Sequence, residues 1–117
     1  MIIASVRIIP LPGKRVEVLD ILRHVQGLLH ASAGCLCCAI YEECEDEPAI
    51  LYLEQWRSEK ELHRHIQSRP YLQILAAMDL ASQAPEICFQ EVANSQGMEL
   101  VEALRGCEQN QKTSLQK

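Results

Sequence analysis

Four residues near the middle of the chain have side chains that could carry proton chemistry. Tyr52, Glu54 and Trp56 alternate along one apolar segment, and His65 follows them. Alternate residues of a β-strand share a face, so Tyr52 and Glu54 could supply a hydrogen-bond donor and acceptor beside the indole. A histidine titrates near neutral pH. Tyr52 and Glu54 are therefore candidate polar groups beside the indole, and His65 is a candidate whose charge can change near neutral pH.

Each of these residues also has a structural interpretation. Trp56 ends its segment and could plug the core, while His65 could satisfy a helix end or a subunit contact. Glu54 could be a charge partner at the rim or across two strands. We expect the remaining histidines on solvated helix faces or helix ends: His24, His30 and His63.

The cysteines raise the separate question of a redox or metal site. Four of the six crowd one segment: Cys35, Cys37, Cys38 and Cys44. In a regular strand, residues three apart point to opposite faces, so Cys35 and Cys38 should not share a metal or a disulfide. Cys88 and Cys107 do not form a second ligand pair. We therefore expect reduced thiols that act as small buried hydrophobic residues, and no metal site.

Composition indicates one globular domain and argues against several partners. The chain has 117 residues, of which 48% are hydrophobic and 23% charged. Its net charge of −5 and lack of a basic run argue against nucleic acid as a partner. No apolar stretch approaches the roughly 20 residues that cross a bilayer, and the Met1 end lacks the pattern of a signal peptide. We therefore expect a cytoplasmic protein with no membrane association.

Hydrophobic periodicity predicts the elements that position these residues. Strands are expected at 2–9, 35–43, 49–56 and 85–92, and an amphipathic helix at 14–31 with Gly34 as a left-handed cap. Ser58 and Glu61 form a capping box that starts a second helix, and Pro70 opens a third. A short terminal helix is expected over 98–104.

The order of these elements is β-α-β-β-α-(α)-β, which predicts an α+β, ferredoxin-like fold with a four-stranded antiparallel sheet. Helices would cover one face of the sheet. The other face also carries apolar residues, including Tyr52 and Trp56 if they point that way. Burying this face against a second copy predicts a homodimer that forms a dimeric α+β barrel. We expect a domain over 1–95 and an extension over 96–117, a short helix followed by a flexible tail.

The segment from Leu53 to Ser68 resembles the signature of the antibiotic biosynthesis monooxygenase family. Its third strand ends in Glu54-Gln-Trp56, a capped helix follows, and His65 lies three positions after the apolar Leu62. The resemblance spans roughly residues 1–95 and is closest to the quinol-monooxygenase branch. It implies a cofactor-independent monooxygenase, without flavin, haem or metal, acting on a small phenolic or quinol-like molecule and dioxygen. It also implies that Trp56 is a pocket wall and His65 the catalytic base or an orienting group.

The resemblance has departures and leaves alternatives. Many relatives carry a second histidine in the turn after the first, where this chain has Arg69-Pro70-Tyr71, so a two-histidine relay is not expected. The haem-degrading branch needs a ligating histidine where this chain has Leu75, which cannot bind iron. An isomerase or lyase acting on a small signalling or ring-fission metabolite, or a non-catalytic stress or binding module, stays open. A ligand-sized pocket of roughly 300 Å³ beside His65 and Trp56 would argue against the binding module.

Overall fold

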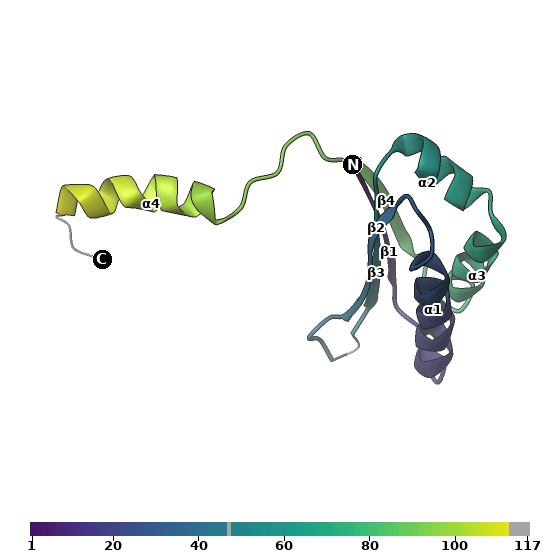
Figure 1. Cartoon of the computed structure of the whole chain (residues 1–117). Coiled ribbons are helices and arrows are strands. Elements are labelled where there is room, and N and C mark those ends of the chain that lie inside the picture. Colours follow the sequence, from purple (N-terminus) through teal and green to yellow (C-terminus); the bar gives the residue numbers. More distant parts are fainter. Residues whose placement is uncertain (47, 113–117) are drawn as a thin grey trace.

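The computed structural model describes residues 1–46 and 48–112 and has the predicted α+β, ferredoxin-like fold. Four antiparallel strands form one sheet in the order β2-β3-β1-β4, and α1, α2 and α3 lie on one side of it (Figure 1). The elements are β1 (Ile2–Ile8), α1 (Arg15–Leu29), β2 (Cys35–Glu42), β3 (Ile50–Trp56), α2 (Glu59–Ile66), α3 (Arg69–Met78), β4 (Glu86–Glu91) and α4 (Met98–Lys112).

The two central strands, β1 and β3, divide their residues strictly between the two faces of the sheet. Every second residue of each strand is buried under the helices, and the residues between them are only partly buried. The helices contribute the opposite half of the core, with Val18, Leu22 and Val25 of α1 fully buried. The inner face of the sheet is Ile2, Ala4, Val6, Ile8, Ile50, Tyr52, Glu54 and Trp56.

This division corrects one expectation about the uncovered face. Tyr52 and Trp56 do not point away from the helices, because both are buried in the core at 1% and 2% exposure. On the two central strands, the partly exposed apolar residues of the outer face are instead Ile3, Leu51 and Leu53.

Gly34 is also used differently from the expectation. The only described glycine with a positive φ is Gly13, at 81°, in the turn after β1. Gly34 is needed for space, because a Cβ atom there would lie 2.5 Å from the side-chain carbon Cδ of Glu61. The glycine thus lets α2 approach the chain just before β2, and Arg57 donates a backbone hydrogen bond to its carbonyl at 2.9 Å.

Strand β2 contains a bulge that changes which cysteines share a face. The register with β3 shifts between Cys35 and Cys37, so that Cys35 lies opposite Trp56 and Cys38 opposite Glu54. The extra residue is Leu36. The expectation that Cys35 and Cys38 point to opposite faces is therefore wrong, since both pack against the core on the inner face.

The terminal helix α4 lies apart from the other elements, at the end of an extended segment that follows β4 (Figure 1). It continues to Lys112, beyond the short helix expected from the sequence. The tail expected after it includes residues 113–117, which lie outside the described residues. None of the described helices combines the length and apolar character needed to cross a membrane.

Candidate functional site

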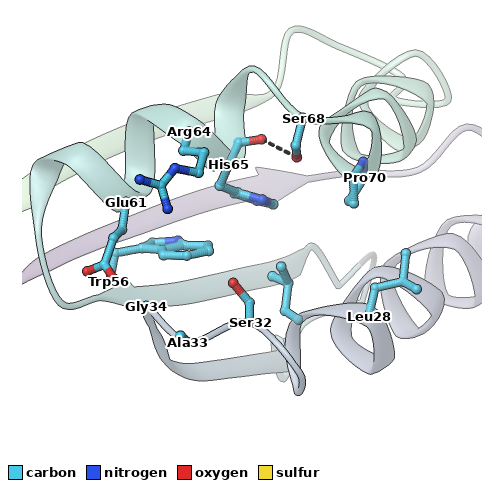
Figure 2. Close-up of a pocket in the computed structure, with 11 residues that line it drawn as sticks. Leu28, Ser32, Ala33, Gly34, Trp56, Glu61, Arg64, His65, Ser68 and Pro70 are labelled. Atoms are coloured by element: carbon cyan, nitrogen blue, oxygen red, sulfur yellow. Dashed lines mark hydrogen bonds between the residues drawn. The ribbon is translucent and has the colours of Figure 1, made fainter.

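A pocket of about 250 Å³ opens beside the aromatic end of the core (Figure 2). It lies between the end of α1, the loop before β2, the end of β3 and helix α2. Its lining residues are Leu28, Leu29, Ser32, Ala33, Gly34, Trp56, Glu61, Arg64, His65, Ser68 and Pro70. Its volume is somewhat below the roughly 300 Å³ at which ligand sites usually begin, so it suits one aromatic ring better than a polycycle.

Glu54 is the centre of a hydrogen-bond network directly beneath this pocket. Its carboxyl group is buried, and it accepts a hydrogen bond from the indole Nε1 of Trp56 at 2.8 Å on Oε1. Oε2 accepts one from the hydroxyl of Tyr52 at 2.6 Å. The same Oε2 lies 3.0 Å from Nε2 of His65. All three neighbours of Glu54 are therefore polar groups able to donate to a carboxylate.

The direction of these bonds assigns the protonation states. An indole N–H can only donate, and the hydroxyl of Tyr52 already accepts the thiol hydrogen of Cys38 at 3.3 Å, which leaves its own proton for Glu54. Donors to both oxygens favour the carboxylate form of a buried acid. With Glu54 as a carboxylate, Nε2 of His65 is the donor to Oε2. Nδ1 of a neutral His65 is then an unprotonated acceptor.

His65 is held between two aromatic rings as well as by Glu54. Its ring stacks on Trp56 with centroids 4.8 Å apart and meets the edge of Tyr71 at 5.4 Å. Although only 5% exposed, His65 lines the pocket together with Trp56. The imidazole is therefore fixed in position and can meet a bound ligand. Within the described part of the chain, Nδ1 of His65 makes no hydrogen bond.

Burial also keeps the supporting groups of the network protonated. It raises the pKa of the Tyr52 hydroxyl far above its usual range, and the negative charge of Glu54 adds to this effect. Burial likewise raises the pKa of the Cys38 thiol to about 12. Cys38 and Tyr52 are therefore donors that support Glu54, and the thiol is a poor nucleophile at neutral pH. No group of three or more potential metal ligands occurs among the residues whose positions are described.

All four predicted site residues meet in this one place. The interpretation of Glu54 as a charge at the rim is wrong, because the residue is 2% exposed and bonded within the core. Trp56 is buried in the core and also lines the pocket. The remaining histidines are exposed, as expected.

Three participants were missed by the sequence reasoning: Cys38, Arg64 and Tyr71. No helical spacing signals the last two, because Arg64 is adjacent to His65 in sequence and Tyr71 lies on the next helix, α3. Nothing in the spacing of the cysteines signals the bulge that brings Cys38 to Tyr52.

The chain is similar to known proteins both in sequence pattern and in fold. The model of the family described as antibiotic biosynthesis monooxygenase matches residues 1–77. Rv0793 from Mycobacterium tuberculosis is 21% identical with a TM-score of 0.74, over 82% of this chain and 98% of its own. A candidate antibiotic biosynthesis monooxygenase from Deinococcus radiodurans is 18% identical with a TM-score of 0.73, over 83% of this chain and 97% of its own. No curated protein matches significantly. At these identities the solved structures show a shared fold.

Proposed function

We propose that this chain, which belongs to the antibiotic biosynthesis monooxygenase family, is a cofactor-independent monooxygenase of a small phenolic or quinol-like substrate. The observation that carries the proposal is the buried pair of Glu54 and His65, at 3.0 Å, beneath a pocket walled by Trp56. A monooxygenase-like activity fits the family. The phenolic substrate and the roles of the residues are inferred from the chemistry of the site.

His65 acts as the general base in this proposal. A phenol hydroxyl of the substrate donates its proton to Nδ1, and the imidazolium that forms is stabilised by the carboxylate of Glu54 through Nε2. The same carboxylate fixes the ring orientation before the substrate arrives, so little reorganisation is needed during proton transfer. Tyr52 and Cys38 act as positioning residues, because they hold Glu54 and do not line the pocket.

The phenolate then supplies the electrons that dioxygen requires. For a phenol with a free ring position, the ring loses four electrons and two hydrogens. One oxygen atom enters the ring as a carbonyl and the other leaves as water, so the products are a quinone and water. The protein deprotonates the substrate and restricts water around the reactive anion, with Trp56 and the apolar wall of α1 enclosing the ring.

The uncovered face of the sheet supports a homodimer in the same proposal. Ile3, Leu51 and Leu53 form an apolar strip that no described helix covers. Burial of this strip against a second copy removes it from water and closes the two sheets into a dimeric barrel. We also propose that residues 1–95 form the enzymatic domain and that 96–117 are an extension.

Oxygen uptake by the purified full chain with a panel of hydroquinones and monocyclic phenols tests the proposal. We expect dioxygen consumption to match quinone formation, and His65→Ala to lower turnover at least roughly tenfold with the circular dichroism spectrum unchanged. His63→Ala is the matched control, since His63 is exposed on the same helix. Turnover without oxygen uptake would assign an isomerase or lyase instead. Full activity in His65→Ala would remove the base from the mechanism.

A further inference from the structure

Arg64 gives this pocket a positive charge that the proposed chemistry does not use. Among the described residues that line the pocket, the ionisable ones are Glu61, Arg64 and His65. Arg64 precedes His65 on α2 and is exposed, whereas His65 is buried. In Figure 2 the guanidinium lies at the Trp56 side of the pocket, so a ligand seated on the indole would come within its reach.

The acidic residue in the pocket lining, Glu61, already has other partners. Its carboxylate accepts hydrogen bonds from Nε of Arg57 at 3.1 Å and from the hydroxyl of Ser58 at 2.9 Å. A second guanidinium nitrogen of Arg57 bonds its other oxygen. These bonds, with smaller contributions from the charges of Arg57 and Arg64, hold the pKa of Glu61 below its usual range, and Arg57 is its direct ion-pair partner.

Arg64 is consequently left without an ion pair in the described part of the chain. A guanidinium is charged at every physiological pH and presents a planar fork that matches a carboxylate with two hydrogen bonds. The rest of the pocket is formed by apolar side chains such as Leu28, Leu29 and Pro70, which suit a ring. The pocket therefore combines a buried acceptor, an apolar middle and a cation at its exposed edge.

We propose, as a deepening of the proposed function, that the substrate is a monocyclic phenol carrying a carboxylate. Its hydroxyl enters toward His65, its ring lies on Trp56, and its carboxylate binds Arg64 at the outer edge. The volume of about 250 Å³ limits the ligand to one ring. Arg64 then determines specificity, because a neutral analogue forfeits its ion pair.

Fluorescence of Trp56 provides a binding assay that does not require turnover. Trp56 is the sole tryptophan of the chain and lines the pocket, so quenching reports a ligand at this site. The probes are 3-hydroxybenzoate and 3-hydroxybenzamide, which have similar shapes and differ in charge. We expect the acid to bind at least roughly tenfold more tightly than the amide to the full chain.

Variants assign that preference to Arg64. Arg64→Gln should remove the preference by weakening the acid alone, and Arg64→Lys should keep part of it, because an ammonium retains the charge without the fork. Arg23→Gln is the control, since Arg23 is an exposed residue of α1 outside this pocket. Equal affinity for the two probes, binding of neither, or a preference that survives Arg64→Gln would overturn the inference.

The same data separate this inference from the proposed function. A preference for the acid with no oxygen uptake from any phenol would support the anion site and defeat the oxygenase. Oxygen uptake from neutral phenols with no preference for acids would support the oxygenase and defeat the role of Arg64.

Discussion

The carboxylates on the two faces of the sheet differ in burial and in their partners. On the inner face, Glu54 is buried, and its oxygens face Tyr52, Trp56 and His65. On the outer face, Glu43 forms a two-pronged ion pair with Arg7, at 2.6 and 2.9 Å, in which both side chains are about one-third exposed. The outer carboxylate has a full countercharge and water. The inner one has hydrogen-bond donors without a full countercharge and is buried from solvent.

This contrast shows how burial changes the function of a charge. A partly exposed ion pair is screened by solvent and contributes little to stability. A buried carboxylate costs several kcal/mol unless every lone pair is occupied, so its surroundings become rigid and specific. The inner face therefore has the fixed geometry that the proposed catalysis needs, and the outer face has the apolar strip that the proposed dimer needs. Three changes test this difference.

Replacement of the inner carboxylate, Glu54, should have the largest effect on stability and turnover. Glu54→Ala leaves the buried donors of Tyr52, Trp56 and His65 without an acceptor, and we expect a loss of about 3 kcal/mol or more in the free energy of unfolding. Glu54→Gln keeps the shape but loses the charge, so it should cost less stability yet reduce turnover as strongly. Urea denaturation and oxygen uptake measure the two quantities. A fully stable Glu54→Ala would show that the network is not structural.

A charge on the outer face should separate subunits without unfolding them. Leu53→Glu places a carboxylate in the apolar strip, and we expect the dimer to become a monomer in light scattering coupled to size-exclusion chromatography. Leu72→Glu is the matched control, because Leu72 is 63% exposed on α3 in the helical layer. If wild type is already monomeric at micromolar concentration, the proposed assembly is wrong.

Replacement of the outer carboxylate should give the smallest effect, and this effect should disappear in acid. Hydrogen bonds from Arg7 hold the pKa of Glu43 below its usual value of 4.5. A carboxyl group with a lowered folded-state pKa stabilises the fold above its unfolded pKa, and this contribution disappears as the pH falls through the folded value. Glu43→Gln should therefore lower the melting temperature slightly at pH 7. It should have no effect at a pH below the folded-state pKa of Glu43, where the wild-type carboxyl group is protonated as well. An equal loss at all pH values would contradict the electrostatic origin.

Much of this arrangement follows from local patterns in the sequence. The alternation in β3 predicts that Tyr52, Glu54 and Trp56 share a face, and the structure confirms it. Ser58 is the N-cap of α2 as predicted, with its hydroxyl accepting from the backbone N–H of Glu61 at 3.3 Å, while the carboxylate of Glu61 bonds that hydroxyl and Arg57. Pro70 lies in the first turn of α3. These features depend on neighbours within a few residues, where backbone geometry alone relates the side chains.

Other features depend on contacts that no local pattern encodes. A single extra residue, Leu36, turns Cys38 toward Tyr52, although regular alternation would have separated Cys35 and Cys38. Position 34 requires glycine because the side chain of Glu61, which is distant in sequence, lies where a Cβ atom would be. Register shifts and close approaches of this kind arise when packing between elements outweighs the regular geometry of one element.

The sequence by itself determined the order of the elements, the two-faced character of β3 and the presence of its four candidate side chains. Only the tertiary structure decided which face is covered, and therefore that Glu54 is buried and bonded to His65 rather than solvated. The physical reason is that alternation along a strand divides its residues between two faces but does not specify which face the helices will cover. The helices must dock on one set before that set becomes the core.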